Sequence, residues 1–193
     1  LIPFEFSTTQ TYMLEFSNLK MRVYKDRGSV LEGDKTISAI TKANPAVVTA
    51  TSHGYENGDE VVITAVGGMT EVNSKRFLVA GKTTNTFQLT NKDGANINSS
   101  SFTTYTSGGV SNKVFEITTP YTTAQLFDLK FAQSADVMYI THPEHEVEKL
   151  SRTAHTAWTL TDVDFTNGPF MDANITTTTL NPGSHTVGTG VAV

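Results

Sequence analysis

The chain has 193 residues, of which 38% are hydrophobic and 17% charged, with a formal net charge of −5 at pH 7. This composition is sufficient for a folded core, and the acidic balance disfavours a basic face for tight, sequence-independent binding to nucleic acid. The absence of cysteine excludes thiolate catalysis, disulfide bridges and cysteine-ligated metal sites, and no apolar run reaches the ~18 residues of a membrane-spanning helix.

β-branched and aromatic residues are abundant, and long helical periodicity is nearly absent, so the sequence predicts a mainly β protein. Two strands, Thr11–Phe16 and Leu19–Tyr24, are expected near the start, joined by a turn at Ser17-Asn18. Apolar and polar residues alternate in both, so that Tyr12 and Leu14 share one face of the first strand. The pattern predicts a β-hairpin with one buried and one solvated face.

From about residue 37 to residue 110 the strands become short and regularly punctuated. The predicted strands are Ala46–Thr51, Glu60–Val66, Arg76–Ala80, Thr86–Thr90 and Phe102–Thr106. The predicted turns include His53-Gly54, Asn57-Gly58-Asp59, Gly67-Gly68, Asn91-Lys92-Asp93-Gly94 and Ser107-Gly108-Gly109. A strand roughly every ten residues, with Gly/Asn turns between strands, predicts a small closed or sandwiched β module.

After Ser111 the longer strand pattern returns, and the one short helix of the chain is expected between Thr122 and Ser134. Thr122 is the predicted N-cap, with Gln125 as its capping-box partner. Leu126 and Leu129 then follow at helical spacing.

Further strands are predicted on both sides of this helix. They are 114–117, Asp136–Thr141, Lys149–Arg152 and Ala157–Phe165. In Asp136–Thr141 apolar residues occupy both faces, which predicts burial on both sides. The tail from Asn174 is rich in threonine, with a turn at Asn181-Pro182-Gly183.

The simplest organisation is a discontinuous β-rich host domain, built from residues 1–36 and 111–193, that carries residues 37–110 as an inserted, barrel-like β module. Compact modules whose termini lie close together tolerate such insertion. Because the sequence begins at Leu1 without methionine and stops at Val193 without a polar tail, we interpret it as a fragment of a longer polypeptide.

The densest group of potential metal ligands is His142-Pro143-Glu144-His145-Glu146. His142 and His145 are weak candidates for a zinc-type site, because the intervening proline prevents a regular helix that would align two imidazoles. A polar turn after a buried strand is the preferred interpretation. A glycosidase pair among Glu144, Glu146 and Glu148 lacks any positional signal.

A hydrolase set of Ser151, His155 and Asp162, with Thr156 beside it, is conceivable, but no Gly-x-Ser-x-Gly turn surrounds any serine. We therefore predict no catalytic residue, no metal site and no cofactor.

Five aromatic residues in the C-terminal half of the sequence are candidates for a platform on which sugars or bases stack. Core packing is the commoner role of such residues. They are Tyr121, Phe127, Phe131, Tyr139 and Trp158.

The flanking segments carry a family resemblance. On the N-terminal side they are Leu1–Ser7 (LIPFEFS), Gln10–Phe16 (QTYMLEF) and Met21–Asp26 (MRVYKD); on the C-terminal side, Thr119-Pro120-Tyr121, Leu126–Ala135 (LFDLKFAQSA), Asp136–Ile140, Lys149–Arg152 and His155–Leu160. These segments resemble, in this order, the tail-tube or nozzle proteins of short-tailed bacteriophages and related prophage tail proteins. The resemblance covers most of residues 1–36 and 114–170.

The predicted insertion has a likeness of its own. The segments Ile40–Thr49 (ITKANPAVVT), His53-Gly54-Tyr55, Asn57–Val61 and Asn85–Leu89 are similar to the first catalytic-cysteine half-domain of ubiquitin-activating enzymes. The thioester chemistry of those enzymes needs a cysteine, which this chain lacks. The resemblance therefore implies a shared β-barrel-like shape without the activity.

The phage-tail resemblance implies a non-enzymatic virion component that assembles with copies of itself and with other tail proteins. DNA would pass through such a ring without tight binding, and contact with the host surface is a further expectation. The implied location is the virion tail, or the bacterial cytoplasm for a prophage product. The alternatives are a glycan- or receptor-binding module on a tail tip and, less favoured, a metal-dependent hydrolase at His142 and His145.

Overall fold

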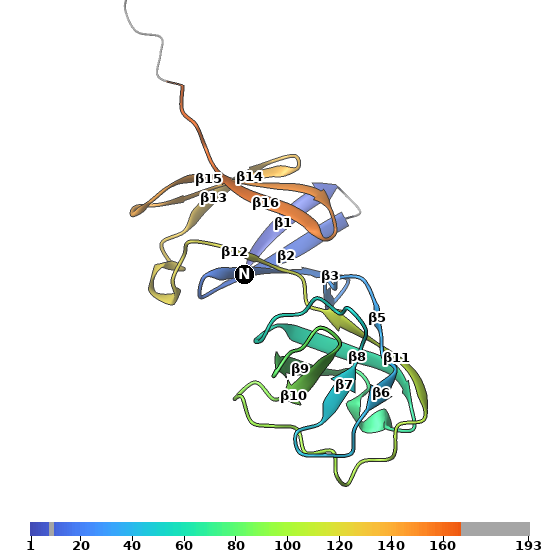
Figure 1. Cartoon of the computed structure of the whole chain (residues 1–193). Helices are drawn as coiled ribbons and strands as arrows, with labels where there is room; N and C mark the ends of the chain where they lie inside the picture. Colours follow the sequence, from blue (N-terminus) through green and yellow to red (C-terminus); the bar gives the residue numbers. More distant parts are fainter. Residues whose placement is uncertain (8–9, 167–193) are drawn as a thin grey trace, which may run out of the picture. The chain divides into compact units, whose positions relative to one another are not determined.

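The computed structural model describes residues 1–7 and 10–166, in which strands carry nearly all of the regular structure (Figure 1). Residues Leu1–Val163 form one compact unit. The mainly β fold class is thereby confirmed. The Thr-rich tail and its predicted turn at Asn181-Pro182-Gly183 lie outside the described residues.

The N-terminal hairpin forms as predicted, within a five-stranded antiparallel sheet. Its strands are β1 (Ile2–Ser7), β2 (Gln10–Ser17), β3 (Lys20–Lys25), β4 (Gly28–Ser29) and β12 (Glu116–Thr118). β12 pairs with β3 although about 90 residues separate them in the sequence, so this sheet joins the chain on both sides of the module.

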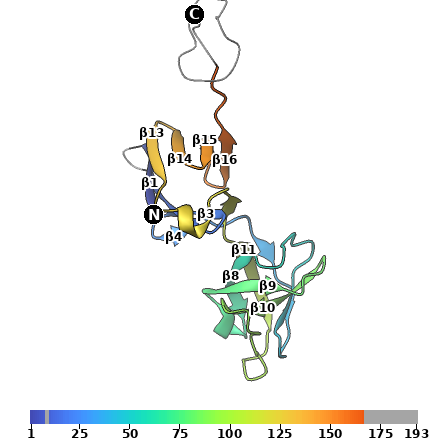
Figure 2. The same cartoon turned by 90° about the vertical axis from the view of Figure 1, so that its left-hand side faces the viewer.

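A four-stranded antiparallel meander follows, in the order β13-β14-β15-β16 (Figure 2). Its strands are β13 (Lys130–Ser134), β14 (Val137–His142), β15 (His145–Ala154) and β16 (Ala157–Asp162). In β14 only alternate residues are buried: Met138 and Ile140 are fully covered, whereas Tyr139 is 41% exposed. The prediction of burial on both faces was therefore wrong, because one side of this sheet faces solvent.

The five- and four-stranded sheets share one hydrophobic cluster, which we call the host core. Its residues are Ile2, Phe4, Tyr12, Leu14, Met21, Val23, Val30, Phe115, Tyr121, Leu129, Met138, Ile140, Leu150 and Trp158. Residues from both ends of the described chain meet there, since the Trp158 ring lies 4.8 Å from Phe4 and 5.4 Å from Tyr12, edge-on to each. Arg152 adds its guanidinium 4.8 Å above the Tyr12 ring.

The predicted helix at 122–134 is replaced by a single 3-10 turn, η2 (Thr123–Gln125), and by β13. The predicted N-terminal capping interaction does form: the Gln125 side chain accepts the Thr122 backbone N–H at 2.9 Å. The helix does not continue, because residues 130–134 pair along their whole length with β14, and this pairing overrides the weak helical preference of the segment.

The outer edge of β1 is closed by a side chain. The Gln133 carboxamide accepts the Glu5 backbone N–H at 3.0 Å and donates to the Glu5 carbonyl at 2.8 Å. Pro3, two residues earlier on the same edge, has no N–H to offer. An edge protected in this way resists the addition of another strand.

Residues around the predicted insertion form a curled, barrel-like sheet of seven strands, in the order β5-β11-β8-β9-β10-β7-β6 (Figure 1). The strands are β5 (Lys35–Thr36), β6 (Ala39–Ile40), β7 (Val47–Thr49), β8 (Glu60–Gly67), β9 (Lys75–Ala80), β10 (Thr86–Thr90) and β11 (Ser107–Lys113), with a 3-10 turn, η1, at Thr70–Val72.

This sheet encloses a second hydrophobic cluster, which we call the module core. It consists of Ile37, Ile40, Ala46, Val48, Ala50, Tyr55, Val61, Ile63, Val66, Met69, Val72, Phe77, Val79, Phe87 and Leu89. The module core and the host core have no member in common.

Two predictions for this region were wrong. Phe102–Thr106 is not a strand; Phe102 and Tyr105 instead pack against the module core, and the Tyr105 hydroxyl donates to the Ile37 carbonyl at 3.1 Å. The predicted turn Ser107-Gly108-Gly109 is the start of β11. A Cβ on Gly109 would lie 2.5 Å from a Val66 methyl group, so glycine permits the close approach of β8.

Candidate functional site

The β14–β15 hairpin carries the two histidines that the sequence offered as weak metal candidates. His142 and His145 face each other as the last pair of the ladder, and their ring centroids lie 5.1 Å apart. The predicted polar turn at Pro143 and Glu144 connects them.

One hydrogen bond fixes the tautomer of His142. The Glu144 backbone N–H donates to His142 Nδ1 at 3.1 Å, so in the neutral ring the proton resides on Nε2. The Glu144 carboxylate in turn accepts a hydrogen bond from Gln125 Nε2 at 2.7 Å, which ties the hairpin turn to η2.

The structure adds two buried residues that sequence analysis did not connect with the histidines. The Tyr121 ring lies edge-on to His145 at 5.2 Å and tilted to His142 at 6.3 Å. Glu148 is on the inner face of β15. We call Tyr121, His142, His145 and Glu148 the polar cluster. Its recognition requires the strand register and the path of the chain after β12, because no local spacing in the sequence links Tyr121 to the hairpin.

Each member of the polar cluster has a buried polar atom without a hydrogen-bond partner among the described residues. These atoms are Tyr121 Oη, His142 Nε2, His145 Nε2 and Glu148 Oε2. Because buried polar atoms in proteins are almost always paired, we expect ordered water to bridge them.

Two carboxylates, Glu148 in the cluster and Asp162 beside it, supply its negative charge. Glu148 stands directly opposite Asp162 in the β15–β16 ladder, and hence on the same face of the sheet. Burial first, and the charge of Asp162 second, raise the pKa of Glu148 above its ordinary value. Burial, Glu148 and Asp162 likewise raise the pKa of Tyr121, which keeps its hydroxyl protonated.

Glu148→Gln is therefore expected to stabilise the protein at pH 7 by about 1 kcal/mol, the size of an unfavourable cross-strand charge pair. Since the folded state holds the Glu148 proton more tightly than the unfolded state, the contribution of this group to stability is greatest below about pH 4.5 and declines as pH rises through the raised pKa. Urea unfolding of wild type and variant between pH 4.5 and 8 measures the difference.

Glu146→Gln is the matched control, because Glu146 lies two residues away on the same strand and is exposed. A gain at pH 7 that is equal in both variants, or independent of pH, would contradict the assignment to Glu148.

Within residues 1–7 and 10–166, no group of three or more His, Asp or Glu side chains is arranged to hold a metal ion. His142 and His145 are adjacent, as the sequence suggested, but the nearby carboxylates do not complete a ligand set with them.

The hydrolase set does not come together either. Ser151 is opposite Thr159 on one face of the β15–β16 ladder, whereas Asp162 is on the other face with Glu148. His155 lies in the β15–β16 turn, where its Nδ1 forms a 2.6 Å hydrogen bond with the Tyr12 hydroxyl of the host core.

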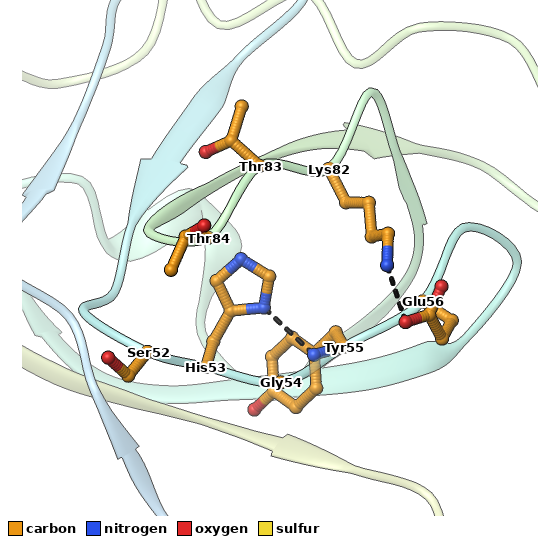
Figure 3. Close-up of a pocket in the computed structure, with 8 residues that line it drawn as sticks. All are labelled: Ser52, His53, Gly54, Tyr55, Glu56, Lys82, Thr83 and Thr84. Carbon is orange, nitrogen blue, oxygen red and sulfur yellow. Dashed lines mark hydrogen bonds and ion pairs between the residues drawn. The ribbon is translucent and has the colours of Figure 1, made fainter.

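A shallow polar pocket opens on the seven-stranded sheet near His53 (Figure 3). His53 is buried at its floor, where Nδ1 accepts the Tyr55 N–H at 3.0 Å and Nε2 contacts the Thr86 carbonyl at 3.3 Å. The ion pair between Lys82 and Glu56 forms part of the wall. Since both ring nitrogens of His53 are occupied by backbone groups, this imidazole has no free nitrogen for chemistry.

Tyr55 supports this pocket from below. Its hydroxyl donates to the Ser111 carbonyl at 2.8 Å, and burial raises its pKa to about 12. Hydroxyl groups of Ser52, Thr83 and Thr84 line the opening, but no aromatic ring of residues 37–110 is exposed there or elsewhere on the module.

The five aromatic residues considered for a stacking platform separate into two groups. Tyr121 and Trp158 are buried in the host core. Phe127, Phe131 and Tyr139 are 92%, 47% and 41% exposed.

The chain is a mainly β protein, and its barrel-like module is similar to a known domain family. The family model of the ubiquitin-activating enzyme E1 FCCH domain matches residues 43–114. This match supports the likeness of the module to the first catalytic-cysteine half-domain; it covers less than half of the chain. No curated protein matches the sequence. No helix in the described part of the chain has the length and apolar character to cross a membrane.

Proposed function

We propose that this chain is a non-catalytic structural component of a phage or prophage tail, a part of a tail-tube or nozzle subunit that acts by assembling with copies of itself. The observation that carries the proposal is the host core, in which β1, β2 and β16 lock two sheets together through Phe4, Tyr12 and Trp158. A rigid framework of antiparallel strands suits a subunit whose task is to hold a fixed shape.

The segments that resemble tail proteins supply much of that framework. Leu1–Ser7, Gln10–Phe16 and His155–Leu160 contain the three aromatic residues that meet in the host core. The net charge of −5 also supports a conduit, because a strongly basic wall would retain DNA in transit. The proposed location is accordingly the virion tail, or the bacterial cytoplasm before assembly of a prophage product.

Electron microscopy of the full-length natural protein that contains this sequence tests the proposal. We expect a homo-oligomeric ring with an axial channel. A population that remains monomeric at micromolar concentration, or assembles without a channel, would contradict it.

The polar pocket at Ser52, Thr83 and Thr84 favours a second candidate function, binding of a host-surface glycan or receptor by a module on a tail tip. Hydroxyl groups suit a sugar ligand, whereas the buried position of Tyr55 and Phe87 removes the stacking surface that sugar sites commonly use. Saturation-transfer NMR with bacterial surface glycans tests it: transfer that is lost on substitution of Thr84 supports binding, and no transfer contradicts it.

A further inference from the structure

His53 is held in the seven-stranded sheet by both of its ring nitrogens and by two aromatic neighbours. Nδ1 accepts the Tyr55 backbone N–H at 3.0 Å, and Nε2 contacts the Thr86 carbonyl at 3.3 Å. The residue is 2% exposed, and its ring centroid lies 5.0 Å from that of Tyr55 and 5.1 Å from that of Phe87. These contacts determine which protons the ring can carry.

Only the neutral imidazole with its proton on Nε2 satisfies both backbone contacts. Nδ1 needs a free lone pair to accept the Tyr55 N–H, and Nε2 needs a proton to donate to the Thr86 carbonyl. A second proton would go to Nδ1 and would face the Tyr55 N–H, donor against donor. The imidazolium form of His53 therefore requires loss of this hydrogen bond.

The charged groups around His53 do not compensate for an imidazolium. Lys82 and Glu56 line the same pocket, but they form an ion pair with each other, and across residues 1–7 and 10–166 no carboxylate pairs with His53. The Tyr55 hydroxyl is neutral, because burial raises its pKa to about 12. Three further carboxylates act on that hydroxyl; they are Glu32, Asp34 and Asp59. A buried positive charge without a partner is costly.

The turn that contains this hydrogen bond has room to open. Gly54, between His53 and Tyr55, is exposed, and a Cβ added there would have no atom within 4 Å. On the inner side, the rings of Tyr55 and Phe87 are 3% and 0% exposed and lie 5.4 Å apart. Movement of the imidazole toward solvent would therefore uncover these two rings at the floor of the pocket (Figure 3).

We propose that His53 is a pH-sensitive switch in the floor of the polar pocket: the neutral ring closes the turn at Tyr55, and the protonated ring leaves its place and opens it. In the open state the rings of Tyr55 and Phe87 provide the stacking surface that the closed pocket lacks. The switch is independent of assembly into a tail tube.

The direction of the pH effect follows from the number of protons bound. A histidine in an open segment takes up a proton near pH 6.5, and the closed turn has no place for that proton. The open state therefore binds one proton more, and its population rises by up to about tenfold for each unit of pH below this value. The closed turn is the stable form at neutral pH, and opening increases as pH falls.

Hydrogen exchange of the Tyr55 amide, followed by NMR on the chain and corrected for the intrinsic exchange rate at each pH, tests the proposal. We expect protection of this amide to fall by about tenfold to thirtyfold from pH 7 to pH 5. The Leu89 amide, which donates to the Ala46 carbonyl at 3.0 Å within the same sheet, should keep its protection, because the opening is local.

His53→Asn is the decisive variant. The Asn side-chain oxygen can accept the Tyr55 N–H in place of Nδ1, as in an Asx turn, but takes up no proton in this pH range. We expect protection of Tyr55 in this variant to be independent of pH. His155→Asn is the matched control, because His155 is exposed and contacts the host core; protection of Tyr55 should then depend on pH as in wild type.

Four results overturn the proposal: protection of Tyr55 that does not change with pH in wild type, His53→Asn with the wild-type pH dependence, His155→Asn without it, or loss of Leu89 protection in parallel with Tyr55. The ring nitrogen chemical shifts of His53 provide a test that needs no variant. We expect the Nε2–H tautomer at pH 7, and an imidazolium at pH 5 with the Tyr55 amide still protected would also contradict the switch. Electron microscopy of the ring decides the proposed function separately.

Discussion

Trp158→Ala is expected to lower the free energy of unfolding of the host core by about 3–5 kcal/mol, the range for removing a buried tryptophan. Trp158 is only 5% exposed, contacts Phe4 and Tyr12 edge-on, and donates its indole N–H to the His155 carbonyl at 3.0 Å. Truncation leaves a cavity where the two sheets meet. Urea unfolding followed by far-UV circular dichroism measures the loss.

The same variant tests the predicted division into a host domain (1–36 and 111–193) and an insertion (37–110). Hydrogen exchange read by mass spectrometry should show faster exchange in β2 and β15 of Trp158→Ala, and unchanged exchange in β8 and β10. Phe87→Ala, which removes a fully buried ring of the module core, should produce the reverse pattern.

Loss of protection throughout the chain in both variants would instead mean that the two cores unfold as one cooperative unit. Tyr139→Ala is the control, since removal of a half-exposed ring from the solvent face of β14 should cost no more than about 0.5 kcal/mol.

The parts of the fold that could be predicted are those in which a local pattern and the tertiary environment agree. Tyr12 and Leu14 alternate with exposed residues in β2, and the structure buries both. The turns at Asn57-Gly58-Asp59 and Asn91-Lys92-Asp93-Gly94 likewise separate strands, because Gly58 and Gly94 supply the positive φ that the chain needs there.

The failures have a common cause, a long-range partner that no local window contains. The capping interaction between Thr122 and Gln125 forms, but residues 130–134 pair with β14 as a strand and do not continue a helix. Gly108 and Gly109 indicated a turn because glycine is common in turns, whereas the structure uses them for the close approach of β8. Local propensity is a weak guide where pairing of distant strands decides the outcome.

Of the polar cluster, only the two histidines, which are close in the sequence, could be predicted to lie together. The sequence placed His142 and His145 in one turn, and they are indeed neighbours. Tyr121 and Glu148 join them through strand register and chain path, so their contribution could not be read from spacing. The sequence held one signal for Glu148: it lies two residues before the apolar Leu150, so in a strand both side chains are on the same face. A polar residue on the buried face of a strand is a candidate for a buried polar site.

A buried carboxylate, Glu60, links β8 to β3 and β9. Its side chain is 4% exposed and forms ion pairs with Arg22 at 2.7 Å and with Arg76 at 3.0 Å. Arg76 also donates to the Ser29 hydroxyl at 2.7 Å, and Arg22 reaches a second carboxylate, Glu116, at 3.3 Å. Glu60 is thus the shared acceptor of two arginines, one from the five-stranded sheet and one from the seven-stranded sheet.

Glu60→Gln is expected to lower the free energy of unfolding at pH 7 by about 2–3 kcal/mol. This lies below the usual cost of breaking a fully buried ion pair, because both arginines are partly exposed and Arg22 retains Glu116. Glu56→Gln is the control: its ion pair with Lys82 is exposed, so the expected change is near zero. Equal effects of the two substitutions would contradict a special role of Glu60.

The pH dependence separates Glu60 from Glu148 by sign. Burial alone would raise the pKa of Glu60, but the hydrogen bond from Arg76 and the charges of Arg22 and Arg76 outweigh it and hold the pKa below its ordinary value. The contribution of Glu60 is therefore complete above about pH 4.5 and is lost as pH falls through the lowered pKa, opposite to Glu148. Glu60→Gln should thus remove part of the acid sensitivity of wild type, whereas Glu148→Gln should remove part of its decline toward neutral pH. If both variants shift the unfolding free energy in parallel across this range, the charge assignments at both sites are wrong.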